Sequence, residues 1–342
     1  MNGLYGDPAR RRGGGSPLLP MLAGVLLTVA VGAGVYWVAL RAPEPAFVRN
    51  AVWLGVTWVN DPHADEEIRL LGEHLSANHV RYAYVYVSYL RVDRTEWNPT
   101  YDHARTFVRK LKAAAPDVQA LAWLGVPART EDGTYRLDSA AVRRRVAQFA
   151  ARTVEQFDFD GVHVNVESVL DGNDDLPLLL EQVRDEIGPD VLLSIAVPPD
   201  WNPGLPEVPA GEAADVGAVW STEYKQRVGA LVDQVALMAY NSGLDTAADY
   251  ETWVAYQVEQ YSTALAGLDN SVELIVGVPT YAEDPGHDEL AESLRAALDG
   301  VRDGLQRAGP ASSVVGGIGL YAFWDTDAVE WALYRELWLQ PQ

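Results

Sequence analysis

The chain contains no cysteine among its 342 residues. This absence excludes disulfide bonds, thiolate metal sites and cysteine nucleophiles. Only six histidines are present, and metal sites usually need three or more converging ligands. We therefore expect no metal site and no bound cofactor.

Positive charge is scarce and unevenly placed. The net charge is −22 and the chain has only three lysines. Residues 1–42 carry four arginines and one aspartate, a charge of +3, so the remainder carries −22 − 3 = −25. A body this acidic repels phosphate backbones, which argues against nucleic acid as a partner. The chain also lacks a P-loop and a G-x-G-x-x-G fingerprint, so no nucleotide is expected.

Long apolar runs are absent except for one near the N-terminus. Residues 18–40 are 23 uncharged residues, about 34 Å long as a helix, against a hydrocarbon core of about 30 Å. Arg10, Arg11 and Arg12 precede them, which favours a cytoplasmic N-terminus and an extracytoplasmic remainder in the cell membrane. A cleaved signal peptide remains the alternative. The predicted organisation is a tail at 1–17, an anchor at 18–40, a linker at 41–49 and a folded domain at 50–342.

The folded domain alternates short apolar segments with longer amphipathic ones. Eight strands are predicted, at 51–59, 80–87, 118–126, 160–167, 191–199, 234–241, 273–281 and 317–324. Helical patterns lie between several of them, at 138–157, 174–187, 249–266 and 288–307. Eight β/α units in about 300 residues predict a single α/β domain, a (β/α)8 TIM barrel.

Active sites of such barrels lie at the carboxyl ends of the strands. Seven of the eight predicted strands end in polar or aromatic residues, and the third, which ends at Gly125 and Pro127, is the exception. Aromatic rings beside hydrogen-bonding groups suit a sugar, although large rings also fill gaps in any barrel.

The fourth predicted strand has the most informative pattern. In "DGVHVNVE" (160–167) three valines alternate with His163, Asn165 and Glu167. A strand sends alternate side chains to opposite faces, so these three polar groups share one face. An unpaired buried carboxylate is costly, which favours a functional role for Glu167. His163 fits a hydrogen-bonded core histidine better than a ligand.

This segment resembles the D-G-x-D-x-D-x-E signature of glycoside hydrolase family 18, the family of chitinases and endo-N-acetylglucosaminidases. Asp160, Gly161 and Glu167 match, whereas His163 and Asn165 replace the two middle acids. Three further segments resemble the family's later strands in the same order, namely "LMAYN" (237–241), "GVPTY" (277–281) and "GGIGLYAFW" (316–324). The closer likeness is to membrane-anchored or secreted bacterial members.

The resemblance implies a retaining, substrate-assisted hydrolase that acts on a glycan with N-acetylated sugars. By position, Glu167 is the general acid, Asn165 holds the acetamide N–H and Tyr240 binds its carbonyl. Other residues assigned to substrate binding are His163, Met238, Asn241, Tyr321, Trp324, Tyr281 and Asp160. We expect His163 to accept a hydrogen bond from the Asn165 amide and so orient it.

Two alternatives remain open on the sequence alone. Loss of the two middle acids favours a barrel that binds glycan without cutting it, for adhesion, sensing or cell-wall assembly. An enzyme with two carboxylates is also possible, with Glu223, Asp245, Glu283 or Asp325 as the partner of Glu167.

Overall fold

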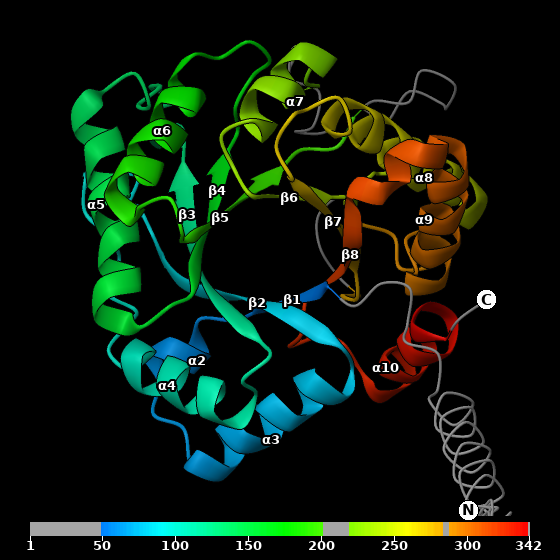
Figure 1. Cartoon of the computed structure of the whole chain (residues 1–342), viewed down its shortest axis with the longest axis horizontal. Helices are drawn as coiled ribbons and strands as arrows, with labels where there is room; N and C mark the ends of the chain where they lie inside the picture. The colour runs from blue at the N-terminus through cyan, green and yellow to red at the C-terminus, as the bar shows by residue number, and fades with distance from the viewer. Residues whose placement is uncertain (1–48, 201–218, 283–286, 341–342) are drawn as a thin grey trace, which may run out of the picture. The chain divides into compact units, whose positions relative to one another are not determined.

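The computed structural model describes residues 49–200, 219–282 and 287–340. Eight parallel strands pair in chain order, and β1 also pairs with β8, so the sheet closes into a barrel. Figure 1 looks down this barrel, with the helices arranged around the ring of strands. The predicted (β/α)8 fold is therefore confirmed.

All eight predicted strands are present, within a few residues of the expected limits. The strands are β1 (Asn50–Leu54), β2 (Val80–Tyr89), β3 (Gln119–Pro127), β4 (Gly161–Glu167), β5 (Leu192–Val197), β6 (Gln234–Met238), β7 (Glu273–Pro279) and β8 (Val315–Tyr321). The helices are α2 (Thr57–Asn60), α3 (Asp65–Ala77), α4 (Ala104–Ala114), α5 (Ala140–Phe157), α6 (Asp175–Ile187), α7 (Thr222–Gly229), α8 (Ala247–Leu265), α9 (Leu294–Ala308) and α10 (Ala328–Tyr334), with short helical turns η1 (Gly309–Val314) and η2 (Arg335–Leu339).

Two of the element limits that differ from the sequence prediction have a clear local reason. The first strand ends at Leu54 instead of residue 59, because Thr57–Asn60 form the short helix α2. Helix α9 begins at Leu294 instead of residue 288, because the Ser293 side chain accepts the Ala296 N–H and caps the helix there.

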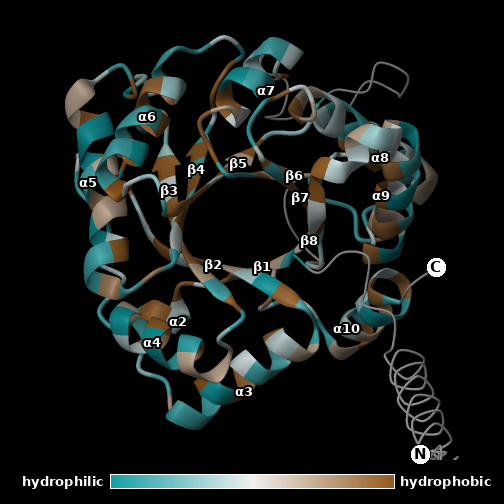
Figure 2. Cartoon of the chain, in the orientation of Figure 1, coloured by the Kyte–Doolittle hydropathy of each residue, from teal (hydrophilic) through white to brown (hydrophobic). Residues whose placement is uncertain are grey.

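The core has two layers that follow from strand alternation. Outward-facing residues such as Val162 and Val164 pack in the large cluster between the sheet and the helices. Inward-facing residues form a second cluster inside the barrel, which includes Trp53 and Tyr84. Figure 2 shows hydrophobic residues concentrated on the strands and hydrophilic ones on the outer helices. Large rings thus occupy the barrel interior, as side chains do in barrels of this fold.

The predicted membrane anchor at 18–40 lies outside the described residues. Within the described ranges, no helix combines the length and apolar character that a membrane crossing needs.

Candidate active site

A pocket of about 920 Å³ opens at the carboxyl ends of the strands. Its lining comes from the β8, β1, β2, β3 and β4 side of the barrel and comprises Gly55, Val56, Thr57, Trp58, Tyr86, Tyr89, Trp123, Gly125, Val126, Pro127, Asn165, Glu167, Tyr321 and Trp324. Among these lining residues, Glu167 is the one with a charged side chain. Aromatic rings around a single carboxyl group suit a substrate that is largely uncharged and has flat apolar faces.

Asn165 and Glu167 form the polar centre of this pocket. Both face inward from the end of β4, as the alternation with buried valines predicts. The Asn165 Nδ2 donates a hydrogen bond of 2.7 Å to Glu167 Oε1. Asn165 is partly buried and Glu167 is exposed, so the carboxyl group can meet a ligand directly.

The prediction that His163 accepts a hydrogen bond from the Asn165 amide is wrong. The Asn165 amide donates to Glu167 instead, and its Oδ1 is buried without a protein partner. The reverse amide orientation would set two acceptors against each other while Glu167 is ionised. A protonated Glu167 could donate its O–H to Oδ1, so the preferred amide orientation depends on the proton at Glu167.

His163 is fully buried inside the barrel and does not line the pocket. Its Nε2 accepts from Trp53 Nε1 at 3.3 Å, so its Nδ1 carries the hydrogen and donates to Ser194 Oγ at 2.9 Å. Its ring stacks on Tyr84, with centroids 4.1 Å apart. The strand register explains the contact with Ser194, because the two residues are paired on β4 and β5. His163 is thus placed as the hydrogen-bonded core histidine that the sequence favoured, away from the residues that line the pocket.

Burial lowers the pKa of His163 from 6.5 to about 3. The folded chain therefore leaves this ring neutral, whereas the unfolded chain protonates it below about pH 6.5. The contribution of the neutral ring to the free energy of unfolding is therefore fully present above pH 6.5 and is lost as the pH falls toward 3. Because of His163, we expect the free energy of unfolding to fall by up to about 1.4 kcal/mol for each pH unit in that window.

His163→Gln, which cannot titrate, should flatten this dependence. The measurement is the free energy of unfolding from denaturant titrations between pH 4 and 7, for both proteins. Parallel curves would contradict the prediction.

Tyr321, Trp324 and Tyr240 form an aromatic group beside the polar pair. Tyr321 and Trp324 line the pocket, and Trp324 is 51% exposed. Tyr240 stacks on Tyr321, with centroids 4.8 Å apart and an interplanar angle of 11°. Burial raises the pKa of Tyr240 well above its ordinary range, and the nearby Tyr321, Tyr281 and Glu167 add to the effect. Met238, at the end of β6, is partly buried and is not among the lining residues.

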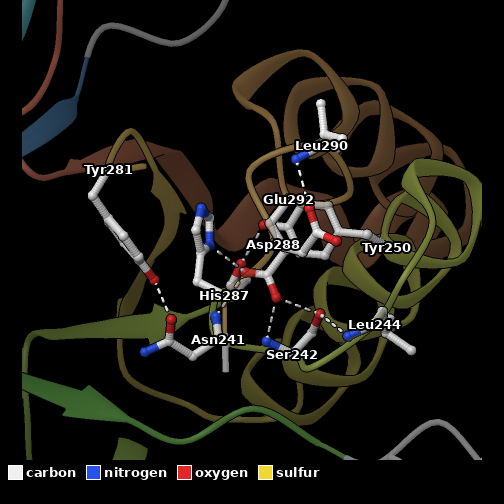
Figure 3. A network of polar contacts seen from close by, with 10 residues as sticks. Asn241, Ser242, Leu244, Tyr250, Tyr281, His287, Asp288, Leu290 and Glu292 are labelled. Carbon is white, nitrogen blue, oxygen red and sulfur yellow. Dashed lines mark hydrogen bonds and ion pairs between the residues drawn. The ribbon is translucent and has the colours of Figure 1, made fainter. Parts of the chain in front are cut away.

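The side chains of Asn241 and Tyr281 point toward each other (Figure 3). The Tyr281 hydroxyl donates to Asn241 Oδ1 at 2.5 Å, and the Tyr281 ring meets Tyr240 edge-on at 6.2 Å. Neither Asn241 nor Tyr281 is among the residues that line the pocket. Asn241 and Tyr281 are therefore better placed to support the Tyr240 ring than to contact a ligand directly.

Asp160 is not among the residues that line the pocket. Asp160 precedes β4, at the opposite end of the strand from Glu167. Its Oδ1 accepts from Lys112 Nζ at 2.6 Å and its Oδ2 from the Ala120 N–H at 2.9 Å. Asp160 therefore fixes the start of β4 against β3.

The third strand is not the exception that the sequence suggested. Trp123, Gly125 and Pro127 all line the pocket, and β3 sets them opposite His163, Asn165 and Glu167 in the register. Trp123 was missed because it precedes the strand end. Strand alternation would have found it, since Leu121 in the inner cluster has the same parity.

Three other aromatic residues complete the lining, namely Trp58, Tyr86 and Tyr89. Burial raises the pKa of Tyr86 to about 12, and the charges of Tyr89, Glu167 and Tyr321 contribute to the shift. A Cβ atom at Gly125 would lie 3.2 Å from the Tyr86 hydroxyl and 3.1 Å from the Tyr89 Cβ. Glycine at this position therefore leaves space for both tyrosines beside the polar pair.

Three of the four rival carboxyl groups do not line this pocket. Glu223, Asp245 and Asp325 are absent from its described lining, and Glu283 lies outside the described residues. No group of three or more potential metal ligands occurs within the parts of the chain that the structure describes.

An eight-stranded α/β barrel with a carboxyl group at the end of β4, in an aromatic pocket, is the architecture of a barrel glycoside hydrolase. A family model described as Glycosyl hydrolases family 18 matches residues 63–315. The chain belongs to this family. The match ends just before the eighth-strand segment that carries Tyr321.

Solved structures share the fold at low sequence identity. The spore cortex-lytic enzyme SleL of Bacillus cereus has a TM-score of 0.56 and 11% identity, over 86% of this chain and 75% of SleL. A family 18 chitinase from Cycas revoluta, solved with allosamidin, has a TM-score of 0.56 and 14% identity, over 85% of this chain and 99% of that one. The C-terminal domain of a putative chitinase from Desulfitobacterium hafniense has a TM-score of 0.57 and 14% identity, over 87% and 99%. No curated protein matches the sequence.

Proposed function

We propose that the chain is a retaining glycoside hydrolase that cuts a glycan containing N-acetylated sugars, with Glu167 as the general acid. The observation that carries this proposal is the 2.7 Å contact between Asn165 and Glu167 inside the aromatic pocket. The pocket presents rings for sugar faces and one carboxyl group for proton transfer. Structures of the Cycas revoluta chitinase include one with (GlcNAc)3, which supports a glycan as the ligand.

In the proposed reaction, Glu167 donates its proton to the glycosidic oxygen as the bond to the anomeric carbon breaks. The acetamide carbonyl oxygen of the substrate attacks that carbon and forms an oxazolinium ion. Water then attacks the same carbon, Glu167 takes a proton from it, and the acetamide is restored with retention of configuration.

Asn165 and Tyr240 would hold the acetamide group during this reaction. The Asn165 Oδ1 is buried without a protein partner, and in the proposed complex it would accept the acetamide N–H. Tyr240 stacks on Tyr321 and is not among the residues that line the pocket; in the proposed complex its hydroxyl would donate to the acetamide carbonyl at the edge of Tyr321. Tyr321 would form the floor on which the sugar ring rests.

A second function is favoured by one specific observation. Both middle acids of the family signature are replaced, and His163 is held in a network within the barrel core. A neutral amide cannot offset the positive oxazolinium ion as a carboxylate would. The same pocket could therefore bind N-acetylated glycan without cutting it.

One screen separates these two functions. Purified protein is incubated with chitooligosaccharides, N-glycans and peptidoglycan fragments, while product release and binding are measured on the same samples. Release that depends on Glu167 supports the hydrolase. Binding without release supports the non-catalytic barrel, and neither binding nor release would reject both.

We also propose that residues 18–40 anchor the chain in the cell membrane with the barrel on the outer side. The apolar run and the three arginines before it support this topology. Protease added to intact cells should remove the barrel, and a barrel protected until lysis would overturn the proposal.

A further inference from the structure

The turn that follows β6 holds Tyr240 between two fixed neighbours. On one side, the Ala239 carbonyl accepts a 2.7 Å hydrogen bond from the buried Tyr250 hydroxyl of α8. On the other side, Asn241 adopts a φ of +54°, a left-handed conformation that asparagine tolerates better than most residues. The backbone therefore leaves the extended conformation of β6 immediately after Tyr240, and the position of its ring depends on what holds this turn of the chain.

Glu292, from the segment between β7 and α9, holds the turn (Figure 3). Its Oε2 accepts from the Asn241 N–H at 2.8 Å and from His287 Nδ1 at 3.1 Å. Its Oε1 accepts from the Ser242 N–H and from the Ser242 hydroxyl, each at 2.6 Å. Four donors thus converge on one carboxylate.

The Glu292 carboxylate is buried, so its hydrogen bonds must compensate for lost water. Glu292 is 2% exposed and the side chain of His287 is 1% exposed. A buried carboxylate is costly unless hydrogen bonds compensate for lost water. Three of the four compensating donors belong to Asn241 and Ser242, the two residues that follow Tyr240. The arrangement therefore links the stability of the carboxylate to the geometry of this turn.

We propose that Glu292 is a positioning residue that sets Tyr240 against Tyr321 for the reaction. This inference rests on the proposed hydrolase function, in which Tyr240 holds the acetamide. Glu292 does not line the pocket and acts through the backbone of Asn241 and Ser242. In Glu292→Gln, one acceptor oxygen becomes an NH2 group that faces other donors, so at least one backbone bond to the turn is lost.

The first test is a double-mutant cycle on the full chain with an N-acetylated oligosaccharide. Glu292→Gln should lower kcat about tenfold while KM changes less than about threefold. In a Tyr240→Phe background, the same change should cost less than about twofold, because the positioned hydroxyl is already gone. Glu292→Asp should recover part of the loss. Equal losses in both backgrounds would overturn the inference.

The second test does not depend on catalysis. Hydrogen exchange of the Asn241 and Ser242 amides should accelerate at least tenfold in Glu292→Gln. Glu289→Gln is the matched control, because Glu289 is an exposed carboxylate in the same segment, and it should leave exchange unchanged. Unchanged exchange in Glu292→Gln would refute the positioning role even if hydrolysis is found. Faster exchange in a chain that cuts no glycan would reject the proposed function alone.

Should Glu292→Gln prove too unstable to purify, Glu292→Asp replaces it in the exchange measurement and Tyr281→Phe replaces it in the double-mutant cycle. Tyr281→Phe removes only the hydroxyl that donates to Asn241 Oδ1 at 2.5 Å. A smaller loss of kcat, again absent in the Tyr240→Phe background, is expected, and additive losses would count against the inference.

Discussion

Glu167→Gln is expected to lower turnover of an N-acetylated glycan at least a thousandfold, while the affinity for that glycan changes less than about threefold. The carboxamide keeps the size and one acceptor oxygen of the carboxyl group but cannot donate the proton that the leaving oxygen needs. Its NH2 group can rotate away from Asn165, so the pocket keeps its shape. Single-turnover rates and binding by calorimetry, on one substrate, measure the two effects separately.

Asp325→Asn and Glu223→Gln are the controls, because both carboxyl groups were candidate partners in a two-carboxylate mechanism. Neither lies in the described lining of the pocket, so both variants should retain turnover within about threefold. A large loss in either control would favour the two-carboxylate reaction. Turnover that survives in Glu167→Gln would mean that the acid lies elsewhere.

The fold was predictable because its signal repeats along the whole chain. Eight apolar segments, each followed by a helical pattern or a polar loop, define a barrel even when single limits are wrong. The end of β1 was placed too late because the apolar residues around Trp58 continue into the short helix α2. Hydrophobicity alone cannot distinguish a strand from the turn of helix that extends it.

The candidate site was predictable wherever it depends on alternation within one strand. The inward direction of Asn165 and Glu167 follows from the parity of β4 alone. The hydrogen-bond partner of Asn165 could not be predicted from this alternation, because His163 is hydrogen-bonded to residues of other strands. Ser194 lies beside it through the register of β5, and Trp53 approaches from β1.

Glu292 illustrates a stronger limit of sequence reasoning. It lies 50 residues beyond Ser242 in the chain, in a segment whose pattern predicted the start of a helix but which precedes α9 in the structure. No periodicity relates it to β6, and its importance appears only when the carboxylate is seen buried among donors from the turn after Tyr240. Contacts between loops at the barrel end depend on tertiary packing that local sequence does not encode.

Asn165→Asp is expected to raise turnover on a 2-acetamido substrate about 30-fold or more. A carboxylate at this position would accept the acetamide N–H and also offset the positive charge that develops on the oxazolinium ion. A gain of 30-fold corresponds to about 2 kcal/mol of transition-state stabilisation. The new carboxyl group would take the place of the amide that now lies 2.7 Å from Glu167 Oε1. Two such groups cannot easily both ionise, so they would share one proton.

The shared proton gives this prediction a second signature besides the rate. It would keep the acid in its proton-donating form to higher pH, so the basic limb of the kcat profile should move upward. Asn165→Ala is the control, because it removes the acceptor without adding charge, and its turnover should fall. A faster Asn165→Asp enzyme with an unchanged pH profile would mean that the carboxylate acts on the substrate and does not couple to Glu167. An unchanged or lower rate would remove Asn165 from the reaction altogether and leave the binding function as the better account of the pocket.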